Sequence, residues 1–248
     1  MKKVRLDRLL VEQGLFSSAD EAARAVYART VRVGDEYAQS PAIKVPADAD
    51  IHVKGRKRFV SRGGDKLQGA LDAFAVDVTG KRCVDVGSST GGFTDCLLQA
   101  GAGQVACVDV NYGQLAWEVR CDERVRVFER TNIKTVEPAR IGAPFDIIAI
   151  DVSFIGLVSL AGVLAGLAQE GGVLLALVKP QFESAHDETD RGVVRDPAVR
   201  ERVVNEVAEA LTEHGFAVKG AIESPITGPK GNVEYLIHAV FEGVGASA

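Results

Sequence analysis

After about residue 65, short apolar runs alternate with longer stretches of helical spacing. The runs have the length and branched apolar content of buried strands. We expect strands at Arg82–Val86, Gln104–Asp109, Val125–Glu129, Phe145–Asp151, Val173–Val178, Ala217–Ile222 and Glu234–Phe241. We expect helices from Phe93, from Gln114, from Leu157 and over Pro197–Glu213, where Pro197 suits the first turn. This alternation predicts an α/β fold with a parallel, doubly wound sheet and helices on both faces.

The first sixty residues follow a different pattern, that of a small α+β module. Leu6, Leu9 and Leu10 have helical spacing, and Ser18–Glu21 has the form of a capping box that starts a second helix. Short strand-like pieces follow at Val31–Val33, Ile43–Val45 and Ile51–Val53. We therefore expect two domains, residues 1–60 and 65–248, with an interdomain linker at 61–64.

The uncharged segment Val152–Ala168 has to be weighed as a membrane span. It is just shorter than the ~18 apolar residues of a transmembrane candidate, and it contains a G-x-x-x-G pair, Gly162 and Gly166. A helix buried between two central strands has the same composition. We expect the buried helix, and no stable membrane association.

Charge is divided unevenly along the chain. Residues 1–66 hold 14 Lys and Arg against 9 Asp and Glu, whereas the remainder holds 15 against 25. A basic N-terminal segment followed by an acidic remainder indicates contact with a polyanion, although an ordinary solvated surface can have the same charge distribution.

The stretch Lys54–Gly64 places five cations around one aromatic residue, Phe59. Such a mixture suits phosphate contacts and base stacking, and it also suits a soluble linker. The candidate RNA contacts in the N-terminal segment and this stretch are Arg5, Arg8, Arg56, Lys57, Arg58 and Arg62.

The cysteines indicate neither a metal site nor a disulfide framework. Cys83, Cys96, Cys107 and Cys121 form no C-x-x-C pair, and most lie in apolar runs, as reduced core cysteines do. The N-terminus lacks the apolar stretch of a signal peptide. We expect a cytoplasmic protein without a bound metal.

A glycine-rich loop follows the first expected strand of the sheet. Asp85 and Gly87 end that strand, and Gly91-Gly92-Phe93 leads into a helix. Ligands of such sheets bind beyond the carboxyl ends of the strands, where glycine permits close approach. The loop matches neither the dinucleotide fingerprint nor a P-loop. Asp109 ends the next strand, where a carboxylate can accept both hydroxyls of a ribose. A purely structural turn is the alternative to a site for a nucleotide-like cofactor.

From Asp85 to Asp95 the sequence resembles the TlyA family of ribosomal RNA methyltransferases, within the FtsJ-like fold group. The resemblance extends over nearly the whole chain, and the N-terminal module resembles the S-four-type RNA-binding domain. The other matching stretches are Ser61–Leu67, Tyr112–Trp117, Asp151–Ile155, Lys179–Glu183 and Gly231–Tyr235. The resemblance implies a Rossmann-like domain that binds S-adenosylmethionine, with Asp85, Gly87, Ser88, Gly91, Gly92, Phe93 and Asp109 as cofactor residues.

The resemblance also implies a catalytic tetrad, which corresponds here to Lys66, Asp151, Lys179 and Glu234. Asp151 and Lys179 each follow an apolar strand, so both should face the cleft that holds Asp85. Charged residues in such places are paired or functional, and a structural ion-pair cluster is the alternative.

The implied reaction is in-line methyl transfer to a ribose 2′-hydroxyl, with cytidine in ribosomal RNA as the target. Lys179 is the candidate to orient the hydroxyl and accept its proton. Lys66 would favour loss of a proton from Lys179 and Asp151 would oppose it, so Lys179 acts either as a base or as a positioning group.

The segment Ser184–Arg191 departs from the family, which has a glycine- and lysine-rich segment here. The acidic loop puts RNA contacts at this place in doubt, and His186 is expected to be a surface histidine. Both ends of the chain are short, which favours the family form that modifies only the large subunit. Two alternative functions are left open. One is a membrane-active hemolysin, since this family also carries that name, and the other is a non-catalytic ribosome-binding factor.

Overall fold

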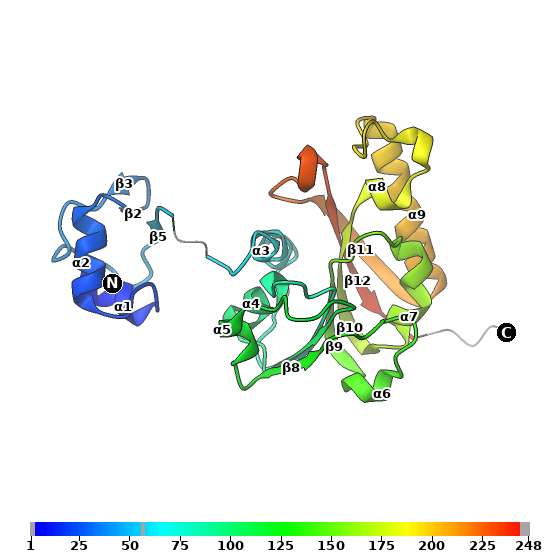
Figure 1. The fold of residues 1–248 in the computed structure, drawn as a ribbon, viewed down its shortest axis with the longest axis horizontal. Helices are drawn as coiled ribbons and strands as arrows, with labels where there is room; N and C mark the ends of the chain where they lie inside the picture. The colour runs from blue at the N-terminus through cyan, green and yellow to red at the C-terminus, as the bar shows by residue number, and fades with distance from the viewer. Residues whose placement is uncertain (1–2, 56–57, 244–248) are drawn as a thin grey trace. The chain divides into compact units, whose positions relative to one another are not determined.

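The computed structural model describes residues 3–55 and 58–243, and the chain divides into two compact units, 1–57 and 58–248. Figure 1 shows the smaller unit in blue and the larger unit from cyan to red. Each unit has a hydrophobic core of its own.

The smaller unit is an α+β module, as the sequence predicts. Its elements are β1 (Lys3–Arg5), α1 (Leu6–Glu12), α2 (Ala19–Tyr27), β2 (Val31–Val33), β3 (Glu36–Tyr37), β4 (Lys44–Pro46) and β5 (Ile51–Val53). Leu6, Leu10 and Val26 form its core together with Val31. The Ser18 hydroxyl accepts a hydrogen bond from the Glu21 amide at 3.3 Å, whereas the Glu21 carboxylate bonds Ser17 instead of closing the expected box on Ser18.

The larger unit contains a seven-stranded sheet in the order β11-β12-β10-β9-β6-β7-β8. The strands are β6 (Arg82–Val86), β7 (Gln104–Val108), β8 (Val125–Phe128), β9 (Phe145–Ile150), β10 (Ala168–Val178), β11 (Phe216–Glu223) and β12 (Tyr235–Phe241). The strands β8, β7, β6, β9 and β10 are parallel, which confirms the α/β prediction.

β12 is the exception to the parallel arrangement. It pairs antiparallel with both β10 and β11. A short connection, 224–234, joins β11 to β12 without the helical crossover that parallel neighbours need. The sheet is therefore mixed at this edge, and Glu234 immediately precedes an antiparallel strand.

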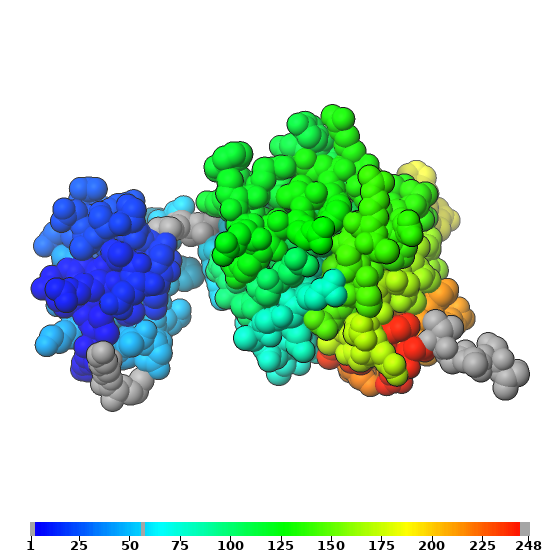
Figure 2. All heavy atoms as spheres, turned by 90° about the horizontal axis from the view of Figure 1, so that it is seen from below, coloured from blue at the N-terminus to red at the C-terminus, as the bar shows by residue number. Residues whose placement is uncertain are grey.

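Helices cover both faces of the sheet, and strand alternation assigns core residues to each face. On one face, α3 (Gly63–Phe74) and α4 (Gly92–Gln99) pack against Cys83, Val105 and Ile147. On the other face, the 3₁₀ helix η1 (Leu157–Leu160), α7 (Ala161–Ala165) and α9 (Pro197–Glu213) pack against Val84 and Ile148. The other helices are α5 (Trp117–Arg120), α6 (Pro138–Ile141), α8 (Pro180–Glu183), η2 (His186–Glu188) and η3 (Pro229–Gly231). In Figure 2, green segments from β7 to α7 form most of the visible surface of this unit.

The apolar segment Val152–Ala168 is not one buried helix. It begins as a loop, forms the short helices η1 and α7, and reaches β10 at Ala168. Three glycines within it, at 156, 162 and 166, lower its helix propensity. Within residues 3–55 and 58–243, the structure has no helix that is both long and apolar enough to cross a membrane.

The stretch expected to link the domains belongs to the larger unit. Phe59 is 2% exposed and packs in the same core as Leu67, so it does not offer a ring for base stacking. Gly64 lies directly over this ring, since a Cβ there would stand 2.1 Å from the Phe59 side chain. α3 already starts at Gly63, so Gly63 and Gly64 belong to the helix and Arg62 is its N-cap. Burial of the apolar Phe59 ring is favourable enough to draw this otherwise polar stretch onto the core.

Candidate active site

A cavity of about 270 Å³ opens where β6, β9 and β10 end. Such an edge is where parallel α/β sheets bind ligands. It is lined by Ser61, Arg62, Gly63, Lys66, Asp85, Gly87, Ser88, Ser89, Thr90, Gly92, Phe93, Asp151, Lys179, Pro229 and Glu234. All four expected tetrad residues therefore lie at one cavity with five of the seven expected cofactor residues.

The glycine loop after β6 brings two strand ends together. Gly87 has a φ of +84°, and a Cβ there would stand 2.3 Å from the carbonyl oxygen of Asp151. Gly92 is equally confined, since its Cβ would lie 2.2 Å from the Ser61 hydroxyl. Glycine at these two places lets the loop, the Asp151 backbone and the start of α3 meet around the cavity.

Asp85 is fully buried, and one of its two oxygens is satisfied inside the protein. Its Oδ2 accepts hydrogen bonds from the Thr94 amide at 2.9 Å and the Thr94 hydroxyl at 2.6 Å. These bonds cap the first turn of α4 from outside the helix. Its Oδ1 is buried without a hydrogen-bond partner among the described residues. Burial raises the pKa of Asp85 to about 7, against the lowering effect of Thr94.

Gly91 and Asp109 are the expected cofactor residues that do not line the cavity. A Cβ on Gly91 would meet Leu115 at 2.8 Å, so its bare side faces the core rather than the cavity. The Asp109 carboxylate follows β7 and accepts hydrogen bonds from the amides of Ser89 and Asn111 at 2.8 and 2.7 Å. It therefore braces the glycine loop beside the cavity.

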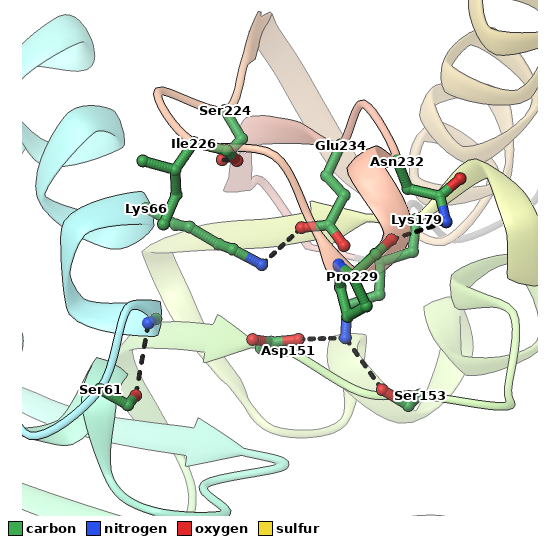
Figure 3. A network of polar contacts seen from close by, with 11 residues as sticks. Ser61, Lys66, Asp151, Ser153, Lys179, Ser224, Ile226, Pro229, Asn232 and Glu234 are labelled. Atoms are coloured by element: carbon green, nitrogen blue, oxygen red, sulfur yellow. Dashed lines mark hydrogen bonds and ion pairs between the residues drawn. The ribbon is translucent and has the colours of Figure 1, made fainter. Parts of the chain in front are cut away.

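The first pair of the tetrad joins α3 to the start of β12. Lys66 Nζ lies 2.5 Å from Glu234 Oε2, with the two side chains 10% and 0% exposed. Gly228 packs against this carboxylate, since a Cβ there would stand 2.1 Å from Glu234 Oε1. Figure 3 shows Lys66 and Glu234 on one side of the network and Asp151 on the other.

The second pair joins the ends of β9 and β10. Lys179, the residue before α8, places its Nζ 2.5 Å from Asp151 Oδ1 and 3.0 Å from the Ser153 hydroxyl (Figure 3). The side chains of Lys179 and Asp151 are 11% and 22% exposed. A small hydroxyl-bearing molecule can thus reach an ammonium group whose position is fixed by two oxygen atoms.

Several residues of this site are not singled out as functional in the sequence. Gly63, Ser89, Thr90 and Pro229 line the cavity, and Ser61, Ser153 and Gly228 contact the glycine loop or the tetrad. Ser61 and Ser153 lie inside the stretches that resemble the family, but a serine in a loop carries no signal of its own. Gly228 is a small residue in a Gly-Pro turn, and only the fold reveals that it faces a buried carboxylate.

The expected RNA-binding residues belong to both units. Arg62 is exposed and lines the cavity, whereas Arg58 donates to the Gln68 side chain at 3.0 Å. In the smaller unit Arg5 and Arg8 are exposed, and Arg5 pairs with Asp7 at 2.6 Å. Arg56 and Lys57 lie outside the described residues.

His186 is exposed at the start of η2, outside the residues that line the cavity. The neighbouring acidic residues are engaged elsewhere: Glu188 pairs with Arg202, and Asp190 with Arg195. The described part of the chain contains no cluster of His, Cys, Asp or Glu able to hold a metal ion.

Comparison with known proteins assigns this arrangement to a family. Residues 59–241 match the FtsJ-like methyltransferase family. The 16S/23S rRNA (cytidine-2′-O)-methyltransferase TlyA of Mycobacterium tuberculosis is 44% identical over 239 residues, 95% of this chain and 89% of that protein. Hemolysin A of Brachyspira hyodysenteriae is 35% identical over 96% of this chain and 100% of its own length. A solved structure titled "Putative hemolysin from Streptococcus thermophilus" is 40% identical, with a TM-score of 0.73 over 98% of this chain and 90% of that one. The chain belongs to the FtsJ-like methyltransferase family, among the relatives of TlyA.

Proposed function

We propose that this protein transfers a methyl group from S-adenosylmethionine to the ribose 2′-hydroxyl of a cytidine in ribosomal RNA. The observation that carries the proposal is the convergence of Lys66, Asp151, Lys179 and Glu234 on the cavity that the glycine loop also lines. The nature of the acceptor is supported by the activity for which the Mycobacterium tuberculosis relative is named.

The residues of the cavity fit a cationic, nucleoside-containing cofactor. The unpartnered Oδ1 of Asp85 can accept a hydrogen bond from a donor in the cavity. The missing side chains of Gly87 and Gly92 let the Asp151 backbone and Ser61 close around the space that the cofactor would occupy. We assign Asp85, Gly87, Ser88, Gly92 and Phe93 to the cofactor. Gly91 shapes the loop, and Asp109, which braces the loop, can receive a ribose.

S-adenosylmethionine supplies a methyl group that is already activated by a positive sulfonium. The protein's task is therefore to align the acceptor: a bond forms between the 2′-oxygen and the methyl carbon, the carbon–sulfur bond breaks, and the hydroxyl proton leaves. Lys179, held by Asp151 and Ser153, orients the hydroxyl. Lys66 and Glu234 form the opposite side of the cavity.

The contacts of Lys179 within the protein favour a positioning role for this residue over proton abstraction. Its ammonium lies 2.5 Å from the Asp151 carboxylate and 3.0 Å from the Ser153 hydroxyl, and these two contacts fix its position. The cation expected to promote loss of its proton, Lys66, is itself neutralised by Glu234 at 2.5 Å. The hydroxyl proton can then pass to Asp151 or to solvent as the bond forms.

We propose that the smaller unit, residues 1–57, is an S-four-type module that docks RNA, and that Arg58 and Arg62 extend the contact on the larger unit. Exposed arginines in both units support this assignment, because phosphate contacts supply most of the affinity for RNA. Ribosomal RNA or a ribosomal subunit is the partner, and the cytoplasm, where ribosomes are found, is the expected location.

The experiment that tests this function is transfer of a labelled methyl group to purified ribosomal subunits and to naked ribosomal RNA. Wild type should label one of these substrates. Lys179→Ala and Asp151→Ala should reduce labelling at least a hundredfold, because the acceptor loses its alignment. Lys219→Ala removes an exposed lysine on β11 and should leave labelling unchanged. Absence of labelling by wild type on every subunit and RNA would exclude the proposed function.

A further inference from the structure

Two segments that leave neighbouring strands are fastened together at both ends. The segment Asp151–Leu157 follows β9, and Lys179–Glu183 follows β10. At one end Lys179 contacts Asp151 at 2.5 Å and Ser153 at 3.0 Å. At the other end Glu183 Oε1 accepts a hydrogen bond from the Leu157 amide at 2.5 Å. The proposed function uses the first fastening and leaves the second unexplained.

The carboxylate of Glu183 is well matched to its position. It meets the first amides of η1, which have no partner within the helix, and a negative charge is favoured at a helix N-terminus. Burial raises the pKa of Glu183, while hydrogen bonds from the Leu157 and Val158 amides oppose the rise. A Cβ on Gly156 would stand 2.6 Å from Glu183 Oε2, so the turn approaches this carboxylate as only glycine allows.

The turn between the two fastenings holds an unfavourable backbone conformation. Phe154 has a φ of +66°, which residues other than glycine seldom adopt. The residue is 90% exposed, so burial of its ring does not explain this conformation. Its ring contacts that of Phe182, with centroids 5.1 Å apart. Strain of this kind persists only where the surroundings enforce it. Glu183 is the charged group that fixes the far end of this turn.

We propose that Glu183 is a positioning residue for methyl transfer, an inference that rests on the proposed function. Its carboxylate connects the Ser153–Leu157 turn to α8. The turn, held in this way, keeps Ser153 and Asp151 in contact with Lys179. Glu183 itself does not line the cavity. Its loss therefore lowers the rate of transfer without removing a contact to the cofactor.

The test compares Glu183→Ala with Glu183→Gln and a matched control, Asp187→Asn, which removes an exposed carboxylate nearby. Glu183→Ala should lower kcat roughly tenfold or more, because small misplacements of reacting groups are costly. Its affinity for S-adenosylmethionine, measured by calorimetry, should stay within twofold of wild type. Glu183→Gln should recover most of kcat, since the amide oxygen still accepts from Leu157. Asp187→Asn should behave as wild type.

A second pair of variants perturbs the same contact from the opposite side. Gly156→Ala pushes the Glu183 carboxylate away and should lower kcat as Glu183→Ala does. Gly166→Ala is the control, because a Cβ there meets no atom closer than 3.4 Å. If Glu183→Ala does not melt cooperatively, Glu183→Gln and the glycine pair decide the question.

A readout independent of catalysis separates this inference from the proposed function. Acylation of the Lys179 amine, followed by mass spectrometry, should become severalfold faster in Glu183→Ala and stay unchanged in Asp187→Asn. If wild type methylates no ribosomal RNA, the proposed function fails, while the acylation rates still test the fastening. Unchanged kcat and unchanged acylation in Glu183→Ala would overturn the inference, as would equal impairment of the Ala and Gln variants.

Discussion

Lys66 and Glu234 lie 168 positions apart in the chain and meet as a buried ion pair, Nζ to Oε2 2.5 Å. The contact ties the first helix of the methyltransferase unit to the sheet edge where β12 runs antiparallel. It combines a residue that precedes the cofactor loop with one that follows the whole parallel sheet. The complete fold is therefore needed to form this side of the cavity.

Removing one member of this pair should be costly for stability. Lys66→Met leaves the Glu234 carboxylate buried without its cation and should lower the free energy of unfolding by about 3–5 kcal/mol. Urea denaturation measures the loss. The exposed pair Lys219–Glu242 serves as the control, and Lys219→Met should cost ~1 kcal/mol or less. Equal costs for the two variants would mean that the Lys66 pair is not buried in solution.

Gly87→Ala should abolish cofactor binding, because its methyl group would strike the Asp151 carbonyl, a backbone atom that cannot move aside. Gly113→Ala is the matched control, since Gly113 has a similar φ of +71° with open space around it. That control should show only the backbone cost, ~1 kcal/mol, with normal binding. Calorimetric titration with S-adenosylmethionine compares the two, and equal affinities would contradict the assigned role of Gly87.

The pKa of Asp85, raised by burial to about 7, predicts two linked pH effects. An unfolded aspartate has a pKa of ~3.9, so between these values the folded protein binds more protons than the unfolded one. The contribution of Asp85 to stability is then fully present below about pH 4 and is lost as the pH rises through 7. The melting temperature of Asp85→Asn minus that of wild type should therefore increase from pH 5 to pH 8.

The same ionisation should govern affinity for a cationic cofactor. Ionised Asp85 attracts a positive ligand, so binding of S-adenosylmethionine should strengthen from pH 6 to pH 8 and release a proton near pH 7. Calorimetry in buffers of different ionisation enthalpy detects that proton. Affinity independent of pH, with no proton released, would show that Asp85 does not face the cofactor.

The parts of the fold that were predicted well are those in which local pattern and final packing agree. β6 and α9 have the expected bounds, because one is an apolar run between polar residues and the other has proline in its first turn. The single helix expected over Val152–Ala168 is wrong, because apolar composition alone does not distinguish a continuous helix from two short helices followed by the start of a strand.

In the site, too, some residues could be predicted from the sequence, whereas others depend on contacts formed only in the folded protein. The tetrad and most of the cofactor loop were assigned by resemblance to a family, and the structure brings these residues to one cavity. The cationic neighbours of Phe59 predict an exposed ring, whereas the ring fills the core beneath Gly64. The contacts of Glu183 and Gly228 depend on segments that meet only after folding, so spacing along the chain carries no sign of them.

The most direct measurement of the central claim is the chemical position of the transferred methyl group. Ribosomal RNA labelled by wild type is hydrolysed with alkali, which cleaves next to a free 2′-hydroxyl but not next to a methylated one. The account predicts that the label is recovered in an alkali-stable dinucleotide whose first nucleoside is 2′-O-methylcytidine, and that Lys179→Ala lowers the yield of this dinucleotide at least a hundredfold. Label recovered in mononucleotides, as base methylation produces, would contradict it.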